Sequence, residues 1–321
     1  MNIQNYAKEI KRKIKTHQTI FIVGHQNLDL DAIGSALGLH NIIKKYRKES
    51  YIIVDDKVHE LGVEKVISEQ PKRIFITSQE IEQKKAKKNL LIIVDTNKIN
   101  LLSNSEILSE FEDIIVIDHH QTNEYTINRG LLIIDKESSS TCEMITQLLS
   151  HYRIKVSPEI ATIILAGIVL DTNNFVLKTQ AKTYFTAYYL ASFGADPKKV
   201  QYYLKQNIKE YIARQKVITN IEVVKEKYAV TTGVEKIQYK REELAKIAST
   251  LIQFNDIEAS FVIGWNQENK IGISARSEGR LNVGKVMEKL GGGGDHHDAA
   301  TQIEANSIQE VKEKLLTILN E

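Results

Sequence analysis

Short apolar runs that alternate with amphipathic stretches dominate the N-terminal part of the chain. The runs are rich in isoleucine, leucine and valine, and they lie at 19–24, 51–54, 73–77, 90–95 and 113–118. The amphipathic stretches between them lie at 32–46, 61–69, 78–88 and 103–111. Strands that are apolar on both faces occur in parallel sheets that helices cover on each side. The pattern therefore predicts an α/β domain with a parallel sheet and helices on both faces, which we assign to residues 1–185.

A second, smaller domain is expected after this one. Strand signals nearly vanish between 139 and 226, and we interpret 186–226 as a helical linker that ends in one long helix, NIKEYIARQKVITNIEVVKEK. Strand-like and helical stretches alternate again over 227–321, which predicts a smaller α/β domain. Two domains also suit a chain of 321 residues, which is too long for one typical core.

The charge balance argues against a long nucleic acid or a membrane as partner. The 43 Lys and Arg residues nearly cancel the 41 Asp and Glu residues, so no strong field attracts a polyanion or a bilayer. The chain has no signal-peptide core and no run of about 18 apolar residues. Its single cysteine, Cys142, excludes a disulfide within the chain. We expect a cytoplasmic location, either as a separate protein or as the cytoplasmic part of a membrane-anchored one.

Acidic and imidazole side chains follow three of the predicted strands, at the point where each strand ends. They are His25, Asp29 and Asp31 after the first run, Asp95 at the end of the fourth, and Asp118, His119 and His120 at the end of the fifth. Asp171 ends an apolar helix and can join them. Because ligands bind outside the carboxyl ends of parallel strands, we expect these groups to converge on one binding site.

Each of these residues also has an ordinary structural interpretation. An Asp after a strand is more often a turn former or a helix N-cap, and Asp31 could simply cap the helix that follows it. That interpretation weakens when several carboxylates meet, because clustered like charges repel unless a cation neutralises them. The joint arrangement therefore favours a metal site.

The types of side chain indicate which metal the site prefers. Two imidazoles and four carboxylates, without a cysteine, suit manganese, with iron, cobalt or zinc as substitutes. We predict two Mn(II) ions about 3.5–4 Å apart. Their ligands would be His25, Asp29, Asp31, Asp95, His119 and Asp171.

Four segments of the sequence resemble the motifs of the DHH phosphoesterases, which are named for an Asp-His-His signature. That signature stands here as VIDHHQTN. The family's other three motifs are similar to GHQNLDLDAIGSALG, IIVDTN and LDTNNF, in the family's order. GISARSEGRLNVGKVMEKLGGGG and AATQI resemble the DHH-associated C-terminal domain. The resemblance covers nearly the whole chain and implies that 1–185 is the DHH catalytic domain and 227–321 its substrate-binding partner.

The resemblance also implies how the ligands divide between two ions. His25 and Asp29 would hold one ion, Asp31, His119 and Asp171 would hold the other, and Asp95 would bridge both. Asp118 and His120 would be catalytic residues beside the ligands, with His120 facing the scissile phosphate. A hydrogen-bonded role in the core is the alternative for His120.

The C-terminal domain carries the expected substrate-binding residues. Arg276 can fork two donors onto a phosphate. The backbone N–H groups of Gly291, Gly292, Gly293 and Gly294 can approach a phosphate or a base, although a loose loop is the alternative.

The residues after the glycines depart from the family pattern. Relatives place a histidine directly after the glycines, where this chain has Asp295. We expect His296 to take over that role; the alternative is that Asp295 occupies the position and repels a phosphate. Asn282 is expected to cap a helix rather than to bind a ligand.

The resemblance is nearest to the cyclic di-AMP phosphodiesterases of the GdpP type. It implies that cyclic di-AMP is hydrolysed to 5′-pApA by a hydroxide that two metal ions activate. The alternatives are a hydrolase of pApA, short oligoribonucleotides or 3′-phosphoadenosine phosphate, and a nucleotide sensor without catalytic activity. A nuclease for long strands would need a basic track, which a net charge of +2 does not support. Relatives of this kind often form homodimers.

Overall fold

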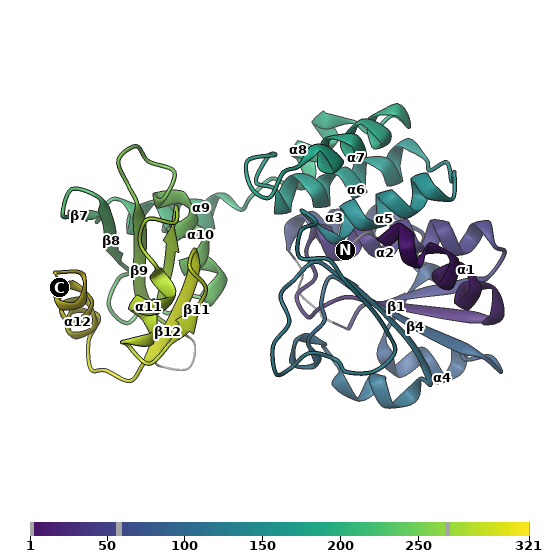
Figure 1. The fold of residues 1–321 in the computed structure, drawn as a ribbon, viewed down its shortest axis with the longest axis horizontal. Coiled ribbons are helices and arrows are strands. Elements are labelled where there is room, and N and C mark those ends of the chain that lie inside the picture. Colours follow the sequence, from purple (N-terminus) through teal and green to yellow (C-terminus); the bar gives the residue numbers. More distant parts are fainter. Residues whose placement is uncertain (1–2, 56–59, 267–269, 321) are drawn as a thin grey trace. The chain divides into compact units, whose positions relative to one another are not determined.

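The computed structural model describes residues 3–55, 60–266 and 270–320, and the chain divides into two compact units, Met1–Lys205 and Gln206–Glu321 (Figure 1). The first unit extends beyond the boundary predicted at residue 185. Helices α7 (Ala181–Ser192) and α8 (Pro197–Tyr203) belong to it because Leu190, Val200 and Tyr203 are buried in its core. Residues 186–226 therefore do not form one linker as predicted, since 186–205 pack against the core of the first unit and 206–226 belong to the second.

The first unit contains a six-stranded sheet in which every pair of neighbours is parallel, as predicted. Its strand order is β3-β2-β1-β4-β5-β6. The strands are β1 (Thr19–Val23), β2 (Glu49–Ile53), β3 (Phe75–Ile76), β4 (Asn89–Val94), β5 (Asp113–Asp118) and β6 (Leu131–Ile134). The sequence pattern did not predict β6, which is short, lies at the edge of the sheet and is fully buried only at Ile133.

Helices cover one face of this sheet more completely than the other. The helices on the thicker side include α1 (Ala7–Thr16), α2 (Leu30–Lys45), α5 (Thr141–His151) and α6 (Pro158–Asp171), with α3 (Leu61–Glu69) and α8 beside them. On the other face, the helices predicted at 78–88 and 103–111 are only α4 (Ile81–Lys84) and a 3-10 helix, Ser105–Glu110. The second of these segments buries few side chains, chiefly Ile107, Leu108 and Phe111, which is too little to support a long amphipathic helix.

Helices α2, α5 and α6 approach one another closely at two glycines. A Cβ atom at Gly34 would lie 2.8 Å from the sulfur of Cys142. A Cβ atom at Gly167 would lie 2.6 Å from the same sulfur and 2.8 Å from the carbonyl oxygen of Leu30. Only glycine permits these contacts, which bring the beginnings of α2 and α5 close to α6.

The second unit is a six-stranded mixed sheet with helices on both faces. Its order is β11-β12-β10-β9-β8-β7, and β8 and β9 are the parallel pair. The strands are β7 (Glu222–Val224), β8 (Tyr228–Thr232), β9 (Ala259–Trp265), β10 (Ile271–Ser277), β11 (Gly293–Gly294) and β12 (Asp298–Ile303). The helices are α9 (Ile208–Ile218), α10 (Arg241–Leu251), α11 (Val283–Glu288) and α12 (Ile308–Asn320). Two separate apolar clusters, one around α11 and α12 and one around α10, cover the two faces.

The long helix predicted for the end of the linker does not form. Helix α9 ends at Ile218, and the chain continues into β7, which pairs antiparallel with β8. Lys225 and Glu226 connect the two strands with φ angles of 50° and 58°, which are left-handed. A tight hairpin turn of this kind normally contains Asn or Gly, and neither residue stands at these two positions. No helix in the described ranges is long and apolar enough to cross a bilayer.

Candidate metal centre

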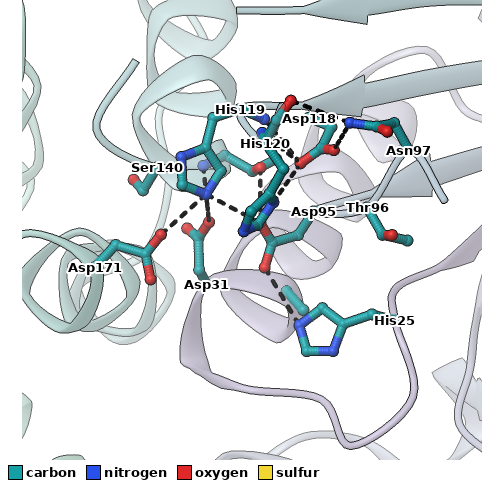
Figure 2. Close-up of polar contacts among 12 residues, drawn as sticks. His25, Asp31, Asp95, Thr96, Asn97, Asp118, His119, His120, Ser140 and Asp171 are labelled. Atoms are coloured by element: carbon teal, nitrogen blue, oxygen red, sulfur yellow. Dashed lines mark hydrogen bonds and ion pairs between the residues drawn. The ribbon is translucent and has the colours of Figure 1, made fainter. Parts of the chain in front are cut away.

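The carboxyl ends of three neighbouring strands meet at one edge of the first sheet. β4 lies between β1 and β5, so the segments that follow these strands are adjacent. His25 follows β1, Asp95 follows β4, and Asp118 ends β5. Figure 2 shows these side chains close to Asp31 of α2 and Asp171 of α6. The polar groups predicted at the strand ends therefore do converge.

His25 and Asp29 stand side by side in the loop that joins β1 to α2. The Nδ1–H of His25 donates to the carbonyl oxygen of Gln26 at 2.7 Å, which leaves Nε2 directed at Asp29, 3.7 Å from its Oδ2. The other oxygen of Asp29 accepts hydrogen bonds of 2.9 Å from the N–H groups of Asp31 and Ala32. Asp29 is thus the N-cap of α2, so the cap considered for Asp31 belongs to Asp29.

Asp95 is buried and lies between the imidazoles of His25 and His119. Its Oδ2 is 3.5 Å from Nε2 of His25, and its Oδ1 is 3.5 Å from Nε2 of His119. Its φ angle is 60°, a left-handed conformation that residues other than glycine rarely adopt and that is often found at functional sites. The backbone thus presents one carboxylate oxygen to each histidine.

The imidazole of His119 is buried among carboxylates without forming a hydrogen bond. Its Nε2 lies 3.0 Å from Oδ2 of Asp171 and 3.9 Å from Oδ2 of Asp31. No polar atom of the described residues meets hydrogen-bond geometry with either ring nitrogen. Because buried polar atoms are normally satisfied, this arrangement fits a nitrogen that binds a metal ion.

The structure gathers the predicted ligands into overlapping groups whose donor atoms lie within 4.8 Å of one another. One group is His25, Asp29 and Asp95, and a second is Asp31, His119 and Asp171. A third group joins Asp95 and His119 to Asp118 and His120. The first two groups correspond to the division that the family resemblance implied, and the assignment of each residue to an ion stays a prediction.

The electrostatics of these groups also suit a cation. Burial, reinforced by the carboxylate of Asp95, raises the pKa of Asp171 to about 6 and raises the pKa of Asp31 as well. Burial opposes protonation of His25, but the carboxylates of Asp29 and Asp95 raise its pKa to about 12. The four carboxylates carry more negative charge than the two imidazoles can neutralise, so they repel one another. A divalent ion would relieve that repulsion.

Asp118 organises the loop that carries the two histidines. Its Oδ1 accepts hydrogen bonds from the backbone N–H of His119 at 2.8 Å and from Nδ1 of His120 at 2.8 Å. Its Oδ2 accepts a bond of 2.5 Å from the side-chain amide of Asn97. The side chain of His120 is 47% exposed, so the structure does not give it the core role that we considered. Asn97 was missed, although it lies within the IIVDTN motif.

Arg276 in the second unit already has partners. It lies on β10 opposite Asp298 of β12. Its Nε is 2.7 Å from Oδ1 of Asp298, and its Nη1 donates to the carbonyl of Ala275 at 2.9 Å. The Asp298 carboxylate therefore holds the guanidinium in place, and a phosphate would have to share it.

The four glycines form an ordered structure, so the loose loop that we considered is not present. The N–H groups of Gly291 and Gly292 donate to the carbonyls of Glu288 and Met287, which ends α11. Gly291 needs its φ of +77° for that cap. Gly293 and Gly294 form β11 and pair with β12. The N–H groups of Gly291 and Gly292, which were predicted to bind phosphate, are thus engaged within the unit.

Asp295 forms the turn between β11 and β12. Its Oδ1 accepts hydrogen bonds of 2.8 Å from the N–H groups of His297 and Asp298. His296 is exposed, and its Nε2 lies 2.9 Å from the carbonyl oxygen of Gly279. The turn explains why an aspartate stands after the glycines, while the role of His296 in binding stays a prediction. Asn282 caps α11 as expected, since it accepts from the N–H of Lys285.

Both units match described protein domains. Residues 19–168 match the DHH family N-terminal domain, and residues 225–321 match the DHHA1 domain. The chain is 34% identical over 322 aligned positions to the cyclic-di-AMP phosphodiesterase PdeA of Listeria monocytogenes. The alignment covers 98% of this chain and 49% of that relative. The chain thus spans about half the length of this curated relative.

Two further comparisons cover the other protein almost completely. The bifunctional oligoribonuclease and PAP phosphatase NrnA of Mycoplasma genitalium is 26% identical, and the alignment covers 92% of each chain. A solved structure of an exopolyphosphatase-related protein from Bacteroides fragilis has a TM-score of 0.80 at 22% identity, with 99% of this chain and 98% of that chain covered. The second comparison shows the shared fold.

Proposed function

The chain belongs to the DHH family, with a DHH domain followed by a DHHA1 domain, and on this basis we propose that it is a manganese-dependent phosphodiesterase that hydrolyses cyclic di-AMP to 5′-pApA. The observation that carries the proposal is the convergence of four carboxylates and two imidazoles at one sheet edge. A structural role would not require so many like charges in one place. The buried ring nitrogens of His119 point the same way, because no atom of the described residues meets hydrogen-bond geometry with them.

The chain's own residues would divide the work as follows. His25 and Asp29 would hold one ion, Asp31, His119 and Asp171 the other, and Asp95 would bridge both. Bound Mn(II) would supply Lewis-acid stabilisation of the phosphate and would activate the attacking water. The bond between phosphorus and the 3′-oxygen breaks, the water oxygen joins the phosphorus, and the 3′-oxygen leaves as a hydroxyl.

We propose that His120 contacts the scissile phosphate. Its Nδ1 is held by Asp118 at 2.8 Å, so its Nε2 is the nitrogen left to face a ligand. A donor that is oriented before the reaction stabilises developing negative charge without further reorganisation. Arg276 is the candidate for a second phosphate contact, with Asp298 keeping its guanidinium oriented.

The choice of substrate rests on the relatives. The similarity to PdeA favours cyclic di-AMP as the substrate, because PdeA aligns with nearly the whole of this chain and is more identical to it than NrnA is. A hydrolase of pApA, short oligoribonucleotides or 3′-phosphoadenosine phosphate is the second candidate, because the NrnA relative is matched over almost its whole length. A nucleotide sensor without activity would not need to keep all six predicted ligands.

Parallel kinetics would test the proposal directly. The purified chain should be incubated with Mn(II) in three separate reactions, which contain cyclic di-AMP, pApA or 3′-phosphoadenosine phosphate. The products should then be separated by chromatography. We expect cyclic di-AMP to give pApA with the highest kcat/KM. Faster turnover of pApA would favour the second candidate, and no turnover of any substrate would favour the sensor.

Two substitutions test whether the metal centre carries the reaction. Asp95→Ala and Asp171→Ala should abolish hydrolysis and weaken Mn(II) binding. Asp113→Ala is a matched control, because Asp113 lies at the opposite end of β5 and contacts Lys13 and His17 instead. Unchanged hydrolysis by the Asp95 variant would contradict the proposal.

A further inference from the structure

A buried polar turn contacts the candidate metal centre, and no sequence motif predicted it. Residues Ser138–Ser140 end the connection from β6 to α5 and Thr141 begins α5, and all four side chains are fully buried. Serine and threonine are seldom buried unless their hydroxyls have partners. The partners in this turn include two of the predicted metal ligands.

The first of these partners is Asp31. Its Oδ2 accepts a hydrogen bond of 2.7 Å from the backbone N–H of Thr141, and its Oδ1 accepts one of 2.8 Å from the N–H of Cys142. These are the first two residues of α5, whose N–H groups have no partner within the helix. Asp31 thus satisfies the N–H groups at the beginning of α5.

The second partner is Asp95. The hydroxyl of Thr141 donates to Oδ1 of Asp95 at 3.0 Å, and both groups are buried. Oδ1 is the oxygen that faces His119, while Oδ2 faces His25. A hydrogen bond to Oδ1 therefore fixes the rotation of the carboxylate that has to present one oxygen to each histidine.

The turn itself is held from behind by other hydrogen bonds. Ser140 caps α5 by accepting from the N–H of Glu143 at 3.0 Å. The buried carboxylate of Glu143 accepts from the hydroxyls of Ser139 and Thr183, each at 2.6 Å. Thr183 belongs to α7, so the position of Thr141 is tied to two helices. The hydroxyl and the N–H of Thr141 are consequently held in fixed positions.

We propose that Thr141 is a positioning residue of the metal centre: its backbone N–H and its hydroxyl orient the carboxylates of Asp31 and Asp95 so that each presents an oxygen to the ions. The inference rests on the proposed function, because it assumes that these carboxylates bind metal. Thr141 does not coordinate a metal or contact substrate in this scheme, and it acts through the two carboxylates.

The expected consequence is specific to the ligands that Thr141 contacts. Removing the hydroxyl frees Oδ1 of Asp95 on the side of His119, so the site formed by Asp31, His119 and Asp171 should weaken more than the site at His25. Groups that orient metal ligands typically change metal affinity by about 10- to 100-fold when they are removed. We expect Thr141→Val to weaken one Mn(II) site by this factor.

Three variants of the full chain test the inference by Mn(II) titration without substrate, using calorimetry and the manganese paramagnetic resonance signal. Thr141→Val removes the hydroxyl, and Thr141→Ser keeps it. Thr146→Val is the matched control, because Thr146 is equally buried in α5 and, among the described residues, its hydroxyl bonds only to the carbonyl of Cys142. Thermal unfolding in a chelator would show that all three variants fold at the titration temperature.

The expected result is that Thr141→Val loses affinity at one of two sites while Thr141→Ser and Thr146→Val stay within about threefold of the wild type. This pattern cannot come from general destabilisation of α5, which Thr146→Val would share. If Thr141→Val binds both ions as tightly as the wild type does, the inference is wrong and the proposed function stands. If the wild-type chain binds no Mn(II), the proposed function fails and the inference fails with it.

Discussion

Replacing Asp171 by Asn should reverse the order of stability between the metal-free and the metal-bound protein. Asp171 is only 19% exposed and lies beside His119 and near the carboxylates of Asp29 and Asp95. Burial and these carboxylates oppose its ionisation, so the negative charge costs stability as long as no cation is bound. Asn has nearly the same shape without the charge.

The pKa of Asp171 sets the size and the pH range of this effect. It rises from 3.8 to about 6 on folding. A pKa difference of this size corresponds to about 3 kcal/mol of lost stability for the ionised Asp171. This is the most that Asp171→Asn can gain, because Asn also loses the contact with the His119 imidazole. The folded protein binds the proton more tightly than the unfolded chain, so the cost is absent below pH 3.8, grows as pH rises and is complete above pH 6.

Thermal unfolding in a chelator at pH 7.5 and at pH 5 would measure the effect. Asp171→Asn should be the more stable protein at pH 7.5, by about 2–4 °C for each kcal/mol in a unit of this size, and its advantage should shrink at pH 5. Saturating Mn(II) should reverse the order, since a ligand at 1,000 times its Kd adds about 4.1 kcal/mol to the protein that binds it, more than the advantage of the variant. Fluorescence of Trp265, the single tryptophan, reports on the second unit and serves as an internal control.

Two results would refute this reasoning. If Asp171→Asn is less stable than the wild type in the chelator at pH 7.5, mutual repulsion among the carboxylates does not dominate the metal-free centre. If Mn(II) stabilises the variant as much as it stabilises the wild type, Asp171 is not a ligand.

Three further predictions concern other residues. Gly167→Ala should lower the free energy of unfolding by about 1–3 kcal/mol in a denaturant titration, because its Cβ would overlap the sulfur of Cys142; Gly272→Ala, where the nearest atom would be 3.5 Å away, is the control. His120→Ala should keep both Mn(II) sites in calorimetry while kcat falls, and a lost site would make His120 a ligand instead. Arg276→Ala should raise KM for the dinucleotide about 10- to 100-fold and leave Mn(II) binding unchanged, as expected for a charged hydrogen bond to phosphate.

Short-range patterns in the sequence determined the first sheet and the candidate ligands. A strand buried on both faces must be apolar along its length, so the runs that became β1, β4 and β5 were visible without any tertiary information. The predicted ligands that follow these strands lie within a few residues of the strand ends, and the parallel topology then requires them to meet. Asp171 was found in the same way, at the end of an apolar helix.

The tertiary structure decided what depends on contacts between distant segments. Thr141 bonds to Asp95 and Asp31, which are 46 and 110 residues away in the sequence, and no local pattern encodes that contact. The need for glycine at 167 arises only where α6 meets α2 and α5. The hairpin that replaced the end of the predicted long helix is likewise stabilised by pairing with β8, which overrides the helical preference of its residues. Local patterns therefore indicated which residues could bind metal, while packing between helices determined what holds them in place.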